Sequence, residues 1–316
     1  MKRIQYHRYG GPELMRLEAF DLATPGEGEV AVEVKFAAIN PIDWKLRGGQ
    51  MKIVTGKSFP RAMGMDFSGT VIAVGPGVKR VAVGDPVFGL ARVKESGALG
   101  EAVITKEGFV ARKPDAVSFE DAACLGTPGV TAWKGLVEKA KLKAGQHVFI
   151  NGCAGAVGEA AVQIARMLGA TVSGSCGAGS MERARSLGVS NVFDYRNTDL
   201  AKIGARFDVV YDTAATMSVA TGLRMLRKGG AYLDLNPTPG KFIRALFDQR
   251  LKPIIGTPRP DILDSVARAA AEGKLQANVG EIVPLDGAIK LIADLEAGRK
   301  LGGKGVVRMN GSARFV

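Results

Sequence analysis

The feature that most constrains this chain is a glycine-rich turn between an apolar run and a helical pattern, at residues 148–158. The turn follows Val-Phe-Ile, a short apolar run that is typical of a buried parallel strand. From Val157 to Leu168 apolar residues recur at helical spacing, and Gly169 follows where helices often end in a left-handed residue. The order of strand, turn and helix predicts one βα unit of a parallel sheet.

The turn has the spacing Gly-x-x-Gly-x-x-Gly, formed by Gly152, Gly155 and Gly158, which is a variant of the dinucleotide fingerprint. Glycines let the backbone approach an anion closely. The free N–H groups of the first helical turn, including those of Ala156 and Val157, point at it with the positive end of the helix dipole. The turn is therefore predicted to bind the diphosphate of a dinucleotide.

A glycine triplet alone is weak evidence in a chain with 42 glycines, because any tight turn before a crossover helix uses the same residues. The segment that follows favours the nucleotide site. Four further strand-like runs come at the spacing of βα units, at residues 170–175, 191–194, 207–212 and 230–235. This repetition predicts a doubly wound parallel sheet, an α/β fold of the Rossmann type.

The beginning of the chain has a different pattern. Residues 1–118 alternate short strand-like runs with glycine and proline turns, which predicts a compact β-rich, barrel-like domain. A last strand at residues 305–309 is expected to return to it. We therefore predict a β-rich domain from residues 1–118 together with 259–316, and a dinucleotide-binding domain from residues 119–258.

Composition excludes several classes. No run of about 18 apolar residues is present, so no membrane span is expected. The absence of a visible signal peptide and three cysteines without a C-x-x-C pair predict a cytoplasmic protein with reduced thiols. The net charge of +12 is spread over single and paired cations, which is typical of a solvated basic surface. No specific nucleic acid is expected, and a weak affinity for anionic surfaces is left open.

Several motifs along the chain carry a resemblance to one superfamily. They are Asn-Pro-Ile-Asp-Trp-Lys at 40–45, Gly-Met-Asp-Phe-Ser-Gly-Thr-Val at 64–71, Gly-Asp-Pro-Val-Phe-Gly at 84–89, the glycine turn, and Gly-Lys-Gly-Val-Val at 303–307. With these motifs the chain resembles the medium-chain dehydrogenase/reductase superfamily, and within it the zinc-free quinone oxidoreductase branch. The motif at 40–45 looks most like the chloroplast-envelope quinone oxidoreductase homologues and the NADPH-dependent alkenal/one oxidoreductases. The resemblance implies a GroES-like β-rich domain and a Rossmann domain.

Zinc-dependent members of this superfamily differ from this chain at positions that matter for metal binding. They have a Cys near the position of Asn40, and a His-Glu pair where Met65 and Asp66 stand here. Amide and thioether groups do not build a His/thiolate site, and three scattered cysteines cannot supply a four-cysteine structural lobe. We therefore predict no metal, and hydride transfer to an acceptor that is already electrophilic.

The second predicted strand of the sheet indicates which nicotinamide coenzyme is used. NAD enzymes place a carboxylate at the end of this strand, where it accepts hydrogen bonds from the ribose 2′-hydroxyl. Here the strand ends in Gly-Ser-Cys-Gly, with no acid before Glu182, which favours NADPH. Candidate contacts to the ribose and its 2′-phosphate are Ser175, Cys176, Gly177, Ser180, Arg183 and Tyr195. A solvated helix position is the alternative for Arg183, and a strand-end aromatic for Tyr195.

Further cofactor contacts follow from the rule that sheet ligands lie beyond the carboxyl ends of the strands. These candidates are Thr213, Ala214, Leu235, Asn236 and Pro237, all expected on the nicotinamide side. The resemblance adds Thr131, Gly303 and Lys304. Lys304 is expected to reach a phosphate or the substrate edge, unless Gly303 and Lys304 form a plain turn.

Reduction of an activated C=C bond or a quinone places hydride on one atom while negative charge grows on a distant oxygen. The resemblance implies that Lys45 stabilises this oxyanion, because the alkenal/one reductases place the lysine of this motif at the substrate and the nicotinamide. Asn40 is a candidate hydrogen-bond donor and Trp44 a candidate pocket wall, although each also suits a structural role. The proton is expected from solvent.

Together these features predict an NADPH-dependent oxidoreductase that reduces the C=C bond of α,β-unsaturated carbonyls or quinones. A quinone reductase with little enone activity is one alternative. A non-catalytic NADPH-binding protein that associates with RNA or an anionic membrane is another, and it predicts steeply salt-dependent binding. Because members of the superfamily often join sheets edge to edge, the chain is also predicted to form a homodimer, and residues 252–255 are the candidate edge.

Overall fold

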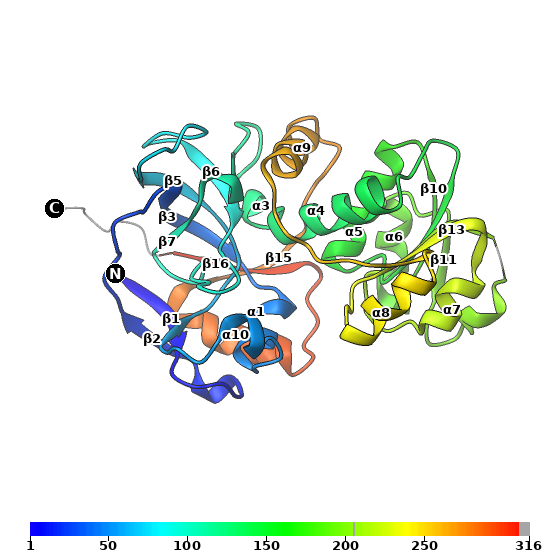
Figure 1. The fold of residues 1–316 in the computed structure, drawn as a ribbon, viewed down its shortest axis with the longest axis horizontal. Coiled ribbons are helices and arrows are strands. Elements are labelled where there is room, and N and C mark those ends of the chain that lie inside the picture. The colour runs from blue at the N-terminus through cyan, green and yellow to red at the C-terminus, as the bar shows by residue number, and fades with distance from the viewer. Residues whose placement is uncertain (205, 310–316) are drawn as a thin grey trace. The chain divides into compact units, whose positions relative to one another are not determined.

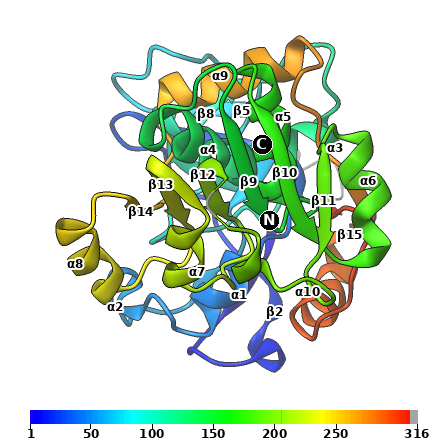
Figure 2. The same ribbon diagram turned by 90° about the vertical axis from the view of Figure 1, so that its right-hand side faces the viewer.

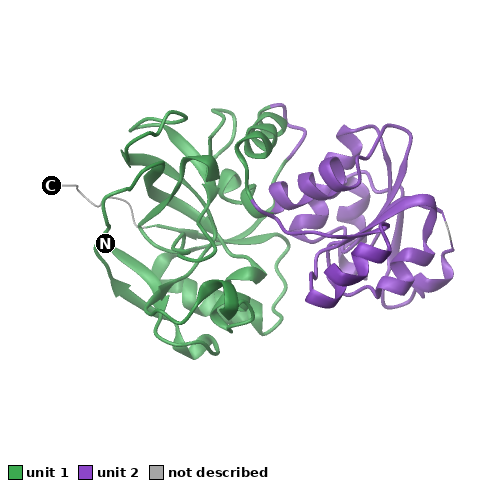
Figure 3. Ribbon diagram, viewed as in Figure 1, with its two compact units in different colours: residues 1–127, 258–271, 276–316 green, residues 128–257, 272–275 purple. Residues whose placement is uncertain are grey.

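The computed structural model describes residues 1–204 and 206–309 (Figures 1 and 2). The chain forms two compact units, coloured green and purple in Figure 3. Unit 1 contains Met1–Thr127, Pro258–Ala271 and Gln276–Val316, and unit 2 contains Pro128–Thr257 and Glu272–Leu275. Residues 310–316, which the sequence assigned to the first domain, lie outside the described part of the chain.

The first boundary lies later than the predicted 118/119 because α3 (Phe119–Ala123) belongs to unit 1. The helix begins at Ser118, whose Oγ accepts a hydrogen bond from the Asp121 amide at 3.1 Å. At its other end, Ala123 joins a small buried apolar cluster with Val306 of unit 1. An apolar face packed in this way keeps the helix with the β-rich unit.

Unit 2 is built on a six-stranded parallel sheet with the order β11-β10-β9-β12-β13-β14 (Figure 2). The strands are β9 (His147–Asn151), β10 (Thr171–Cys176), β11 (Asn191–Asp194), β12 (Phe207–Asp212), β13 (Leu226–Asp234) and β14 (Leu251–Pro253). The chain runs outward from β9 to β11 and then crosses to β12 on the other side of β9. The predicted doubly wound sheet is confirmed, and β14 adds an edge strand.

Both faces of this sheet are covered by helical segments. They are α4 (Gly126–Trp133), the π-helical η3 (Lys134–Lys139), α5 (Ala156–Met167), the 3-10 segments η4 (Ala178–Ser180) and η5 (Leu200–Lys202), α6 (Met181–Ser186), α7 (Val219–Arg224) and α8 (Pro239–Phe247). On one face Phe149, Val210 and Tyr232 pack with Leu223 of α7. Tyr211 points to the other face, where its hydroxyl donates to the carbonyl of Thr131 in α4 at 2.8 Å. Alternation along each strand therefore fills two separate cores.

Unit 1 contains a seven-stranded, mainly antiparallel sheet and a smaller three-stranded one. The large sheet has the order β15-β16-β3-β5-β6-β8, with β7 paired to β3. Its strands are β3 (Glu29–Ala38), β5 (Asp66–Val74), β6 (Pro86–Leu90), β7 (Ala102–Lys106), β8 (Val110–Arg112), β15 (Val279–Pro284) and β16 (Lys304–Arg308). The small sheet has β1 (Lys2–Tyr6), β2 (Arg16–Ala19) and β4 (Arg61–Ala62). The last strand returns to this unit as predicted, because β16 pairs antiparallel with β3.

Short helices complete unit 1. They are α1 (Pro41–Arg47), α2 (Lys52–Thr55), α3, α9 (Pro260–Ala271) and α10 (Ala288–Glu296), with the 3-10 turns η1 (Pro12–Leu14), η2 (Glu107–Phe109) and η6 (Leu285–Gly287). The end of α1 is tied down by Arg47, which is fully buried and donates to the Gly10 carbonyl at 3.1 Å and to Glu296 of α10 at 2.5 Å. In the described part of the chain no helix is long and apolar enough to cross a membrane.

Candidate active site

The glycine turn joins β9 to α5, as predicted. Gly152 has a φ of +82°, a conformation that residues with side chains rarely adopt. Gly155 caps α5 and has no side chain to accept hydrogen bonds from the first-turn amides. A Cβ on Gly158 would lie 2.0 Å from the carbonyl oxygen of Gly152, so only glycine fits there. The first-turn amides, including those of Ala156 and Val157, therefore face a turn with no side chain in the way, which fits the diphosphate of a dinucleotide.

A polar network ties the carboxyl ends of the neighbouring strands together. The side-chain amide of Asn151 donates to Asp212 Oδ1 at 2.7 Å, and its oxygen accepts from Ser175 Oγ at 2.6 Å. Thr213 Oγ1 donates to the Asn151 carbonyl at 2.7 Å. Burial raises the pKa of the Asp212 carboxyl, while the hydrogen bond from Asn151 lowers it. The hydroxyl of Ser175 is thus engaged within the protein, and the network holds the Thr213 backbone beside the glycine turn.

The end of β10 shows where the candidate 2′-phosphate contacts lie. The Tyr195 amide donates to the Cys176 carbonyl at 3.2 Å, which brings the tyrosine to this strand end. The guanidinium of Arg196 lies over the Tyr195 ring, 5.3 Å from its centroid. Arg183 is bound instead by both carboxylate oxygens of Glu159 in α5, with Nη2 2.8 Å from Oε2. The bond to Glu159 raises the pKa of Arg183.

Arg196 was not a candidate in the sequence. It could have been recognised as a candidate phosphate contact from its position directly after the Asp194-Tyr195 pair. Among residues 1–204 and 206–309 its guanidinium forms no ion pair with a carboxylate, whereas the predicted cation Arg183 is paired with Glu159. The structure thus places Arg196, a cation that the sequence analysis did not propose, against the predicted Tyr195.

The remaining cofactor candidates of unit 2 differ in accessibility. Thr131 is buried in α4 and Cys176 is buried at the end of β10, where burial raises the pKa of its thiol. Gly177 and Ser180 lie beside and within η4 and are partly exposed. The Ala214 amide donates to the Asn151 carbonyl at 3.2 Å. Beyond β13 the chain continues through Leu235, which is partly buried, and through Asn236 and Pro237, which are exposed.

In unit 1 the structure brings together two candidates that are far apart in the sequence. Lys304 Nζ donates to Asn40 Oδ1 at 2.6 Å, and the Asn40 side-chain amide donates to the Ala38 carbonyl at 3.1 Å. Gly303 precedes Lys304 at the start of β16. Asn40 is buried, so its side chain has a role inside unit 1. The alternative of a plain turn does not describe Lys304, whose ammonium reaches inward from β16.

The helix that follows Asn40 carries the two other catalytic candidates. Trp44 is partly buried and packs against the large apolar core of unit 1. Lys45 is exposed, and no ion pair is seen for it among the described residues. Its ammonium is therefore free for a ligand, while the indole has a structural contact.

The residues at the positions of a catalytic metal do not offer a suitable donor set. Met65 and Asp66 are both buried, and the thioether sulfur of Met65 accepts a hydrogen bond from Ser96 Oγ at 3.9 Å. Within residues 1–204 and 206–309, no group of three or more His, Cys, Asp or Glu residues is arranged to hold a metal ion.

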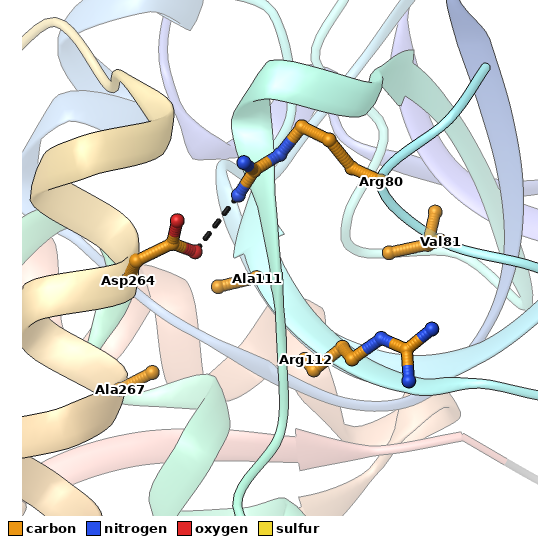
Figure 4. A pocket seen from close by; sticks show the side chains of 6 residues that line it. All are labelled: Arg80, Val81, Ala111, Arg112, Asp264 and Ala267. Atoms are coloured by element: carbon orange, nitrogen blue, oxygen red, sulfur yellow. Dashed lines mark hydrogen bonds and ion pairs between the residues drawn. The ribbon is translucent and has the colours of Figure 1, made fainter.

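A hollow of about 310 Å³ in unit 1 contains none of the candidate residues. Figure 4 shows Arg80 reaching across it to Asp264 of α9, at 2.8 Å. Arg112, which also lines it, pairs with Asp85 at 2.9 Å. Because both guanidinium groups already have carboxylate partners, the hollow is not a candidate for the chemistry.

Comparison with known proteins agrees with this geometry. Residues 26–115 match the family model of the alcohol dehydrogenase GroES-like domain, and residues 187–307 match that of the zinc-binding dehydrogenases. A chloroplast envelope quinone oxidoreductase homolog of Arabidopsis thaliana is 28% identical over 91% of this chain and 92% of its own length. A trans-enoyl reductase of Aspergillus terreus is 34% identical over 88% of this chain and 85% of its own.

Among solved structures, the Escherichia coli quinone oxidoreductase complexed with NADPH superposes with a TM-score of 0.82. It is 26% identical, and the match covers 98% of this chain and 100% of that one. The chain belongs to the medium-chain dehydrogenase/reductase superfamily, in its quinone oxidoreductase branch. It is accordingly an NAD(P)-dependent oxidoreductase of the quinone oxidoreductase or enoyl reductase type, with a GroES-like unit 1 and a Rossmann unit 2.

The glycine turn generates a first prediction. The substitution Gly158→Ala is expected to weaken binding of the nicotinamide coenzyme at least about tenfold, because its Cβ pushes the first turn of α5 away from the Gly152 carbonyl. Coenzyme fluorescence titration measures the Kd. Gly240→Ala is the matched control, because a Cβ at Gly240 meets nothing within 4 Å. Equal affinities for the two variants would contradict the assigned diphosphate site.

Proposed function

We propose that this protein is a zinc-independent, NADPH-dependent reductase of the activated C=C bond of α,β-unsaturated carbonyls and of quinones. The observation that carries the proposal is the exposed ammonium of Lys45 on α1, in the same motif as a buried Asn40. An exposed ammonium that has no ion-pair partner within residues 1–204 and 206–309 is suited to stabilise an oxyanion that forms during the reaction.

The donor chemistry of unit 1 supports the absence of a metal from this reaction. Alcohol oxidation in the zinc enzymes needs thiolate and imidazole ligands, and here Asn40 and Met65 stand at those positions. Quinones and enones need no metal to polarise them, because conjugation already makes them hydride acceptors. The names of the relatives, a quinone oxidoreductase and a trans-enoyl reductase, belong to these two acceptor classes.

In this proposal, coenzyme binding and stabilisation of the oxyanion belong to different residues. The amides between Gly152 and Gly158 hold the coenzyme diphosphate, and the backbone at Thr213 and Ala214 lies at the same edge of the sheet. The bound coenzyme supplies hydride. Lys45 donates a hydrogen bond to the acceptor oxygen as negative charge grows on it, and solvent supplies the proton that completes the reduction.

Lys45 generates the central test. Lys45→Ala is expected to lower kcat/KM for the active acceptors about 10²–10³-fold, the usual effect of removing one oxyanion donor. NADPH oxidation is followed with an enone, an enal, an acrylate and a benzoquinone. Lys45→Arg keeps the charge and is expected to retain part of the activity. Lys106→Ala removes another exposed lysine of unit 1 and serves as the control.

Three results of this panel separate the alternatives. Activity with the benzoquinone alone would favour a quinone reductase proper. No NADPH oxidation with any acceptor, together with binding to RNA or anionic vesicles that falls steeply with salt, would favour a non-catalytic protein. Unchanged kcat/KM in Lys45→Ala would remove Lys45 from the mechanism.

The preference for NADPH rests on the end of β10. In this region Arg196 and Tyr195 offer a cation and a phenol hydroxyl, and the 174–177 segment has no carboxylate to repel a 2′-phosphate. The Escherichia coli relative has been solved in complex with NADPH, which supports the same coenzyme here. We assign the binding of the 2′-phosphate to Arg196, since Arg183 is already bound by Glu159.

The two arginines give different expected outcomes. Arg196→Ala is expected to weaken NADPH binding about 10–100-fold and to leave NADH binding unchanged, because only NADPH carries the 2′-phosphate. Arg183→Ala is expected to weaken both coenzymes alike, because it leaves Glu159 unpaired in the first turn of α5. Calorimetric Kd values for both coenzymes decide the assignment. A loss confined to NADPH in Arg183→Ala would reverse it.

We also propose a homodimer formed through the free edge of the parallel sheet. β14 is the last strand of that sheet, and α8 lies next to it in sequence with no buried residue. The apolar side chains of Leu246 and Phe247 on α8 are 77% and 87% exposed, and Ile255 after β14 is exposed as well. An unpaired strand beside exposed apolar side chains favours a self-complementary contact with a second copy.

Changing this surface is expected to change the oligomeric state. The double variant Leu246→Ser/Phe247→Ser is predicted to elute as a monomer, with a dimer constant weakened at least about tenfold, because the exposed apolar area is removed. Light scattering after size exclusion measures the mass. Val83→Ser, which changes an exposed apolar residue of unit 1, is the control. A monomeric parent protein would exclude this dimer.

A further inference from the structure

A compact cluster of polar and charged side chains lies inside unit 1, where β5, β16 and the beginning of α1 meet. We call it the buried acid cluster, formed by Asn40, Asp43, Asp66 and Lys304. The Asn40 amide donates to Asp43 Oδ2 at 2.7 Å, and the Asn40 side-chain oxygen accepts from Lys304 at 2.6 Å. Asp43 and Asp66 are 2% and 0% exposed. Two buried carboxyls thus lie in the same cluster as the ammonium of Lys304, which is itself partly buried.

The carboxyl groups of Asp66 and Asp43 differ in how many hydrogen bonds they accept. Asp66 accepts hydrogen bonds from Thr127, with the amide at 3.0 Å from both oxygens and the hydroxyl at 2.5 Å from Oδ1. Asp43 accepts the Asn40 amide at Oδ2, while its Oδ1 is buried with no hydrogen-bond partner among the described atoms. A buried carboxylate with an unsatisfied oxygen is costly unless a charge of opposite sign lies nearby.

Lys304 supplies that charge to both carboxyls. The pKa of Asp43 is raised to about 7, mainly by burial and in part by the nearby Asp66, against the lowering effects of the Asn40 backbone, Lys304 and the Met65 backbone. Burial also raises the pKa of Asp66, and Lys304 is the largest influence in the opposite direction. The other titratable neighbours are Cys124, whose pKa burial raises to about 12, and Asp121, which acts on Cys124.

The cluster also fixes the beginning of α1. Asn40 is the residue before the helix, and its backbone amide and side-chain oxygen are held by Asp43 and Lys304. The other end of the same helix is held by Arg47, which is fully buried and bound by the Gly10 carbonyl and Glu296. Because both ends are held, the backbone of the helix that carries the exposed Lys45 is anchored on either side of this residue.

We propose that Lys304 is a positioning residue, the internal cation that holds Asn40 and compensates Asp43 and Asp66, and thereby sets the helix that carries Lys45. For Lys45 this rests on the proposed function, whereas the effect on the buried carboxyls is independent of it. The role differs from the cofactor contact that the sequence suggested, because the ammonium is directed at the Asn40 side chain within unit 1.

The test compares Lys304→Met with Lys304→Arg by thermal unfolding between pH 5.5 and 8.5. Folding holds the Asp43 proton more tightly than the unfolded chain does, because its pKa rises from 3.8 to about 7. The stability that this bound proton contributes is therefore lost as the pH rises from about 4 to about 7. Without the ammonium the folded pKa values of both carboxyls rise further, so Lys304→Met keeps losing stability above pH 7.

The expected result is a Tm difference from the parent protein that widens with pH. It grows by about 2 °C for each unit by which the carboxyl pKa rises, given the length of 316 residues. Lys304→Arg restores the parent profile, because it keeps the charge. Lys35→Met, which removes a half-exposed lysine of β3 paired with Glu33, is the control and shows no such widening. A Tm difference of Lys304→Met that is the same at every pH would mean a packing role alone and would overturn the proposal.

Two further measurements keep the outcomes distinct. Adding Asp43→Asn to Lys304→Met is expected to reduce the pH dependence and to restore folding if the single variant does not fold. With NADPH, Lys304→Met is expected to bind with a Kd within about threefold of the parent while kcat falls, since the glycine turn lies in unit 2. Weakened NADPH binding with an unchanged pH profile would assign Lys304 to the coenzyme and refute the positioning role. If no acceptor is turned over, the proposed function fails, and the unfolding profiles still decide the role of Lys304.

Discussion

The close approach of the backbone at Gly158 and Gly152 determines where this protein can hold a coenzyme. A Cβ at Gly158 has no room against the Gly152 carbonyl, so α5 begins directly at the carboxyl end of β9. The same edge of the sheet carries Asn151, which ties β9 to β10 and β12 through Ser175 and Asp212. One steric constraint thus aims a helix N-terminus at an anion, and a hydrogen-bond network keeps the neighbouring strand ends in register with it.

Unit 1 meets a different physical problem, the burial of charge. Arg47 is compensated by Glu296 and backbone oxygens, and Asp66 is compensated by Thr127 and Lys304. Residues 26–115 of this unit match the alcohol dehydrogenase GroES-like domain, yet the groups at the expected metal positions are an amide and a thioether. The amide oxygen of Asn40 accepts a hydrogen bond from the partly buried ammonium of Lys304, which places a positive charge beside the buried carboxyls of this unit.

Local patterns predicted the elements that depend on local physics. The glycine turn, the strands at β9, β10, β11 and β12, the left-handed Gly169 and the return of β16 to the first unit are all found. The sequence placed a sheet edge at residues 252–255, where β14 (Leu251–Pro253) is found, whereas the pairing of β15 with β16 was not predicted, because partners far apart in the chain are set by tertiary contacts rather than by local pattern. The boundary at 118/119 failed for the same reason, since α3 is defined by what it packs against.

For the site, the sequence alone determined the residue types that chemistry requires: glycines for the turn, no acid at the end of β10, and a lysine in the motif at 40–45. The tertiary structure decided which of the charged groups are free. It placed Arg183 against Glu159, left Arg196 over Tyr195, and directed Lys304 to Asn40 from a strand 264 positions away. Glycine geometry is a property of a few consecutive residues and can be read from their order. The availability of a charge depends on the opposite charges around it, and only folding brings those together.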